Sequence, residues 1–86
     1  MASVADIKSA INAALAHVRD GQLAVRDAGG RLDDAQRALA AAVHGSGHDA
    51  VTAAQAALQY AATELDECLA ATLRAVEQAE SYASVL

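Results

Sequence analysis

The residues with the clearest capacity for chemistry are two histidines around a short glycine-rich segment. His44 and His48 flank Gly45-Ser46-Gly47, and Asp49 follows directly. A metal ion needs ligand atoms that converge at about 2 Å. Histidines four residues apart satisfy this on a continuous helix, but the two glycines favour a turn here. We therefore expect no metal ligand among them, only polar residues that flank two helix ends.

The single cysteine and the paired carboxylates also predict no catalysis. Cys68 follows Asp66 and Glu67, whereas a reactive thiol needs exposure and an electropositive environment. We expect Cys68 to act as a small apolar residue in a helix contact. Adjacent carboxylates on a helix point about 100° apart and cannot work as an acid/base pair. No phosphate-binding loop, nucleophile elbow or Glu-x-x-His motif occurs. We predict no enzyme, no catalytic residue and no cofactor.

The elements that carry these residues are predicted by a heptad repeat on each side of the glycine-rich segment. Before it, position a holds Val4, Ile11, Val18, Val25, Leu32 and Leu39, and position d holds Ile7, Ala14, Gly21, Ala28, Ala35 and Ala42. After it, position a holds Val51, Leu58, Leu65, Thr72, Ala79 and Leu86, and position d holds Ala54, Ala61, Cys68, Ala75 and Tyr82. This pattern predicts an all-α fold in which two long antiparallel helices form a hairpin.

Folding the chain back at Ser46/Gly47 places large residues opposite small ones. Leu39 then faces Ala54, and Val25 faces Cys68, as close interdigitation of two helices requires. The predicted seam inside the hairpin consists of Val18, Val25, Leu32, Leu39, Val51, Leu58, Leu65 and Cys68.

The helix boundaries follow from capping signals within a single domain, residues 1–86. We predict helices over about residues 3–44 and 49–84, with a turn at 45–48. Ser3-Val4-Ala5-Asp6 is typical of a capping box with Asp in place of Glu. Gly45 suits the left-handed residue that ends a helix, and Ser46 or Asp49 can cap the second one.

Three glycines interrupt the first predicted helix. Gly21, Gly29 and Gly30 each cost about 1 kcal/mol relative to alanine, so one interpretation is a break into two shorter helices. The heptad phase nevertheless continues from Val25 to Leu32 without a shift. We therefore predict one continuous helix, in which Gly21, at position d, allows close contact.

A second set of apolar residues is not used by the predicted seam. The e positions of an antiparallel pair lie on one side, and contiguous exposed apolar surface usually marks an interface. We therefore predict that two hairpins dimerise into a four-helix bundle through Leu15, Leu23, Leu69, Leu73, Val76 and Ala83. On the opposite side, Arg31 and Glu64 are placed to form an ion pair between the helices.

Composition limits the possible partners. The 86 residues are 55% hydrophobic, about half of that alanine, with no Phe or Trp and a single Cys. The net charge is −5, and residues 45–86 carry Arg74 alone against six acidic side chains. This balance disfavours nucleic acid and anionic membranes. A small core without disulfides favours self-association; we expect a homodimer, with a different protein as the alternative partner. Without a signal peptide or an apolar span, we expect a cytoplasmic protein.

An alanine-rich hairpin of under a hundred residues with glycine at the turn resembles the WXG100 (ESAT-6-like) proteins of actinobacteria. That family carries Trp-x-Gly at the turn, where this chain has Gly45-Ser46-Gly47 without Trp. Its Tyr-x-x-x-Asp/Glu motif follows the second helix, where this chain has Tyr82 but Leu86 in place of the acidic residue. The resemblance implies a small dimer secreted, without a cleavable signal peptide, by a type VII system.

Three functions follow from these patterns. The first is a non-enzymatic, self-associating hairpin that serves as a structural or adaptor module. The second is the exported WXG100-like protein. The third is a helical bundle that binds a metal or a small ligand.

Overall fold

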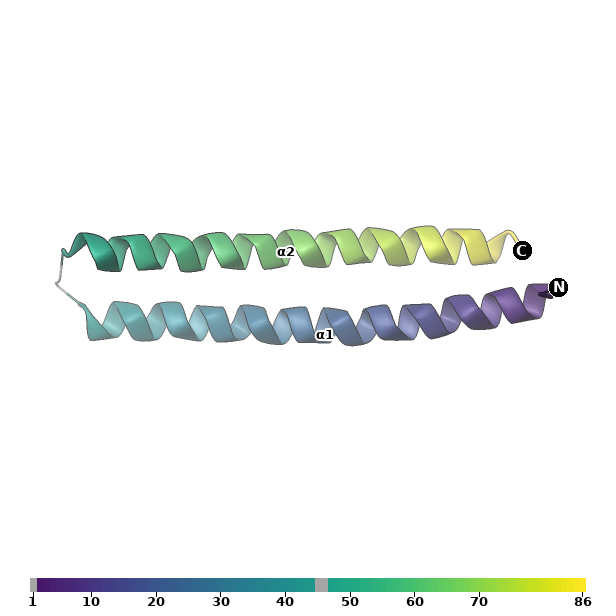
Figure 1. Ribbon diagram of the computed structural model, residues 1–86, viewed down its shortest axis with the longest axis horizontal. Coiled ribbons are helices and arrows are strands. Elements are labelled where there is room, and N and C mark those ends of the chain that lie inside the picture. Colours follow the sequence, from purple (N-terminus) through teal and green to yellow (C-terminus); the bar gives the residue numbers. More distant parts are fainter. Residues whose placement is uncertain (1, 45–46) are drawn as a thin grey trace.

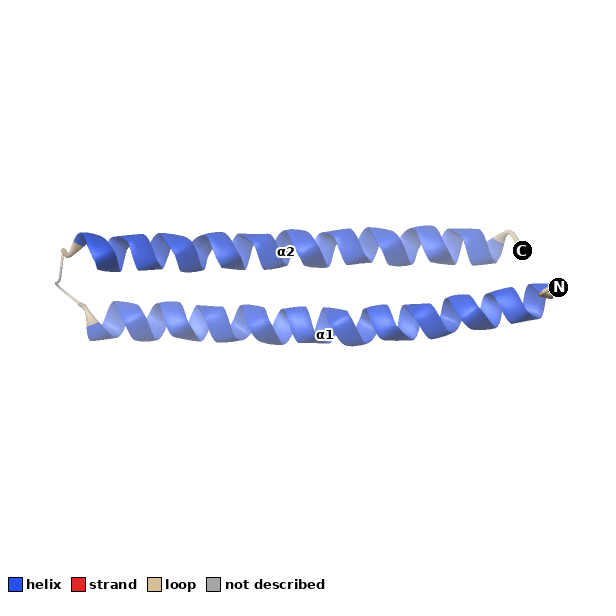
Figure 2. Cartoon of the chain, in the orientation of Figure 1, coloured by secondary structure: helices blue, strands red, loops and turns tan. Residues whose placement is uncertain are grey.

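The chain forms two long antiparallel helices. The computed structural model describes residues 2–44 and 47–86. Helix α1 spans Val4–Ala42 and helix α2 spans Asp49–Ser84, and they lie side by side with both chain termini at the same end (Figure 1). All regular secondary structure in the described residues is helical (Figure 2). The predicted all-α hairpin is confirmed.

The hairpin is a thin rod. Its extents are 65 × 17 × 15 Å and its radius of gyration is 19.5 Å, whereas a compact domain of this length has a radius of gyration of about 12 Å. Each helix therefore covers only one stripe of the other.

The two helix starts are capped in different ways. The Asp6 amide donates to Ser3 Oγ at 3.1 Å and the Ser3 amide donates to Asp6 Oδ2 at 3.2 Å, so the predicted capping box is confirmed. At the start of α2 the capping residue is His48, whose Nδ1 accepts from the Ala50 amide at 3.0 Å. Asp49 is the first helical residue instead, where its carboxylate suits the helix dipole. Gly45 and Ser46 lie outside the described residues.

Helix α1 continues through all three of its glycines, as the unbroken heptad phase predicted. The expectation that Gly21 allows close contact is wrong, because a Cβ added there would meet nothing within 4 Å. The same holds for Gly29 and Gly30. Within one hairpin these glycines therefore weaken the helix without any packing that needs them.

The seam between the helices uses positions a and e rather than a and d. Leu15 and Gln22, both at position e, are the least exposed side chains, at 5% and 7%. Together with these two, the half-buried residues at positions a and e recur at alternating spacings of three and four: Ile11, Val18, Val25, Gly29, Leu32, Gln36 and Leu39 on α1, Val43 directly after it, and Val51, Gln55, Leu58, Ala62, Leu65, Leu69, Thr72, Val76, Ala79 and Ala83 on α2. Most d positions, including Cys68, are exposed.

The preference for position e has a simple physical reason. Position e carries large apolar residues such as Leu15 and Leu69, where position d carries mostly alanine. Each additional methylene removed from water contributes about 0.8 kcal/mol. Turning position e toward the neighbouring helix therefore covers Leu15, Leu69 and Val76, although it also brings glutamines into the seam.

The register also differs from the predicted one by one residue. A hydrogen bond places Gln22 opposite Thr72, where the predicted fold-back placed it opposite Ala71. Val25 consequently lies level with Leu69 and not with Cys68. Large still faces small in several layers, since Leu15 lies level with Ala79 and Leu32 with Ala62.

Candidate protein-interaction surfaces

The apolar residues predicted to form the dimer interface do not share an exposed face. Leu15 is buried inside the hairpin, and Leu69, Val76 and Ala83 are half-buried along the seam. Of the predicted set only Leu23 and Leu73 are exposed, at 63% and 45%. The expectation of a free stripe at position e is therefore wrong, because those positions are occupied in holding the two helices together.

A polar layer crosses the seam near the middle of the hairpin. Gln22 Nε2 donates to Thr72 Oγ1 at 3.2 Å, and Thr72 Oγ1 donates to the Leu69 carbonyl at 2.7 Å. Among the described residues no buried side-chain polar atom lacks a partner. A polar pair inside an apolar seam favours one register over its neighbours, because any shift leaves the glutamine amide unpaired.

We expect Thr72→Val to lower the free energy of unfolding by about 1–2 kcal/mol. Valine keeps the shape of threonine but leaves the buried Gln22 amide without its acceptor. Urea unfolding monitored by circular dichroism measures the change. The matched control is Thr63→Val, since Thr63 is exposed and bonds only its own helix backbone. Equal effects of the two substitutions would contradict the polar layer.

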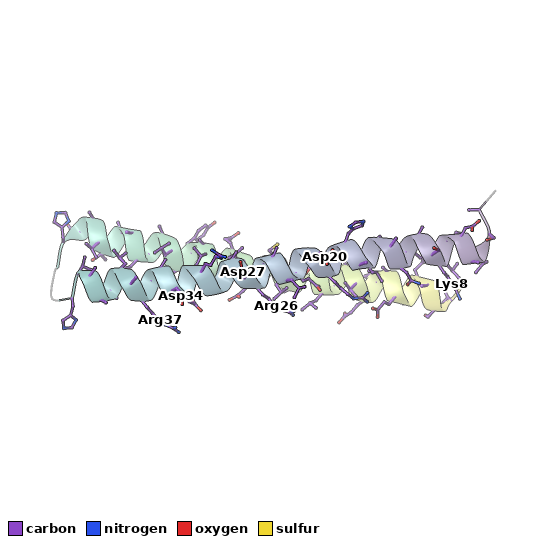
Figure 3. All side chains as sticks on the ribbon, turned by 90° about the horizontal axis from the view of Figure 1, so that it is seen from below. Lys8, Asp20, Arg26, Asp27, Asp34 and Arg37 are labelled. Atoms are coloured by element: carbon purple, nitrogen blue, oxygen red, sulfur yellow. The ribbon has the colours of Figure 1, made fainter. Side chains whose placement is uncertain are left out.

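One edge of the rod, next to the b positions of both helices, carries the exposed polar contacts between the helices. Arg19 on α1 pairs with Glu80 on α2 at 3.4 Å, and Gln36 lies 3.4 Å from Gln59. Arg26 and Arg37 project from the same edge of α1 (Figure 3). Arg19 and Glu80 are both more than half exposed, so their pair contributes under about 1 kcal/mol. We call this surface the polar edge.

The opposite edge is lined mostly by small residues, with larger polar ones such as His17 and Gln78 between them at position g. Because the b positions of the two helices meet on one edge, their d positions meet on the other, with the g positions next to them. We call this surface the small-residue face; it contains Ala10, Ala14, Gly21, Ala24, Ala28, Ala35, Ala38 and Ala42 of α1 and Ala54, Ala57, Ala61, Cys68, Ala71 and Ala75 of α2. All are exposed except Ala28 and Ala61, which are half-buried.

Sequence reasoning missed this face because it assigned position d to the seam. The signal was present, since positions d and g are both rich in alanine on both helices. Near the chain ends the face also carries two larger exposed residues, Tyr82 at 52% and Val85 at 77%.

Two charged residues interrupt the small-residue face. Arg31 and Glu64 both occupy position g, and the expected ion pair between them is wrong. Arg31 Nε instead binds Asp27 Oδ2 at 2.9 Å along its own helix. The physical reason is that position g points away from an a/e seam, so the two side chains diverge within one hairpin.

The remaining candidates for chemistry stay dispersed in the fold. His48 caps α2, His44 lies beyond the end of α1, and Cys68 is exposed. Within residues 2–44 and 47–86 no three metal-ligating side chains converge, and no pocket is present. In that same part of the chain, neither helix has a stretch long and apolar enough for a membrane span.

No family model, curated protein or solved structure matches this chain.

Proposed function

We propose that this chain is a non-enzymatic, self-associating helical hairpin that serves as a structural or adaptor module. Two copies form a four-helix bundle. The observation that supports this most strongly is the exposed area of a single copy. It is 6091 Å², whereas a compact protein of 8.7 kDa exposes about 4,700 Å².

The excess of about 1,400 Å² is larger than the area that one partner contributes to a standard interface, about 800 Å². The reason for the excess is the rod shape, in which each helix covers one stripe and leaves the rest exposed. The described part of one copy buries a single apolar side chain, Leu15. Chains of this size usually need a further source of stability, and a second copy supplies it.

The test is the solution mass of the purified chain across a dilution series from about 1 mM to about 1 µM, with circular dichroism on the same samples. We expect a dimer at high concentration that loses helicity as it dissociates, because folding and association share the same apolar area. A helical monomer throughout the series would contradict the proposal.

A second candidate is the WXG100-like exported protein. The elongated hairpin and the exposed Tyr82 near the end of α2 favour it. Detection of the chain in culture medium, with loss of export on Tyr82→Ala and no loss on Tyr60→Ala, would support this function. Retention of both forms in the cell would contradict it.

A further inference from the structure

We propose that the second copy binds the small-residue face with its turn at the same end of the rod, so that α1 of each copy packs against α2 of the other. This inference rests on the proposed self-association. It specifies which surface the two copies use and which two-fold symmetry relates them. The two-fold axis then runs along the rod, between the two hairpins.

The shape of the face suits a second copy of itself. Helices packed through alanine and glycine approach to the short end of the usual 8–10 Å range, and only an equally smooth surface can follow them that closely. In the register of the hairpin, Ala24 lies within one residue of the level of Ala71, and Ala38 lies within one residue of the level of Ala57. A two-fold axis along the rod brings these same pairs together between copies. The exposed area of one hairpin is large enough to supply such an interface.

Net charge selects between the two possible symmetries. The alternative axis runs across the rod and stacks α2 on α2 and α1 on α1. Helix α2 carries six acidic residues and Arg74, whereas α1 carries five residues of each sign. Stacking α2 on α2 opposes two helices of net negative charge, which disfavours that arrangement. The axis along the rod places each α2 against the balanced α1.

The charged residues of the face support the same symmetry. Arg31 and Glu64 lie within one residue of the same level of the rod but diverge within one hairpin. In the proposed dimer, Arg31 of one copy faces Glu64 of the second copy, and the symmetry produces this pair twice. The present partner of Arg31 is an exposed neighbour on its own helix, so exchanging it costs little.

The first experiment compares Ala71→Glu with Ala70→Glu. These adjacent exposed residues point about 100° apart on α2, and only Ala71 belongs to the small-residue face. We expect Ala71→Glu to weaken dimerisation about 100-fold or more, because it places a carboxylate in each apolar contact. We expect Ala70→Glu to change it less than about threefold. Circular dichroism at high concentration reports whether each variant remains helical.

The second experiment tests the symmetry by exchanging charges. Arg31→Glu places two carboxylates opposite each other in a homodimer, and Glu64→Arg places two guanidinium groups there. We expect each variant alone to dimerise about tenfold more weakly than the wild type. An equimolar mixture should recover the dimer, since both contacts of the mixed dimer then pair opposite charges. Contacts within one hairpin cannot produce rescue by mixing.

The outcomes separate this inference from the proposed function. A wild-type chain that is monomeric at every concentration contradicts both. A wild-type dimer that Ala71→Glu leaves intact overturns the small-residue face and keeps self-association. A dimer weakened by Ala71→Glu but not rescued in the mixture of charge variants overturns the axis along the rod.

Discussion

Leu15→Ala should lower the free energy of unfolding by about 2–4 kcal/mol, the typical effect of truncating a buried leucine. Leu15 is the single buried apolar side chain among the described residues, and the alanine level with it, Ala79, cannot fill the space. A loss of this size is a large part of the stability of so small a domain. Chemical denaturation at fixed protein concentration measures it, because association would otherwise alter the midpoint.

The matched control is Leu23→Ala on the same helix. Leu23 is 63% exposed, so its truncation should change the free energy of unfolding by less than about 0.5 kcal/mol. If position e faced outward, Leu15 would be exposed like Leu23, and the two truncations would have similar effects. If position e faces the seam, only Leu15 is buried. Equal losses would therefore contradict the a/e seam, whereas a large difference would support it.

Replacing Gly29 and Gly30 together by alanine should raise the free energy of unfolding by about 2 kcal/mol. Both residues are helical and a Cβ at either meets nothing within 4 Å. Alanine is favoured over glycine by about 1 kcal/mol at each helical position. The expected rise in melting temperature is about 10 °C, measured by thermal circular dichroism.

The control for this gain is the reverse change at an exposed position of the same helix. Ala16→Gly should lower the free energy of unfolding by about 1 kcal/mol. A double alanine variant less stable than the wild type would mean that the two added methyl groups clash with a neighbouring group. That result would contradict the open surroundings of Gly29 and Gly30.

Local chemistry made much of this fold predictable. Helix α1 begins after Ser3 because Ser3 and Asp6 satisfy each other's amides, a bond between residues three apart. The heptad spacing from Val25 to Leu32 contains no inserted residues that could form a loop. The helix therefore continues through Gly29 and Gly30. The hairpin itself follows from two apolar repeats separated by a turn. Each of these features depends on neighbours in the chain, which the amino-acid order states directly.

Which residues of each helix are buried and which are exposed was harder to predict than the helices themselves. The sequence alone determined the apolar position a of each helix and left two neighbours for it, position d with mostly alanine and position e with a few large apolar residues among glutamines. Only the tertiary structure decided which stripe is buried. The choice depends on whether burying Leu15, Leu69 and Val76 gains more free energy than exposing the alanines of position d loses. It also depends on whether Gln22 can form a hydrogen bond with Thr72. That balance involves both helices at once, so no local pattern could settle it, and it placed Cys68 and the alanines on the outside.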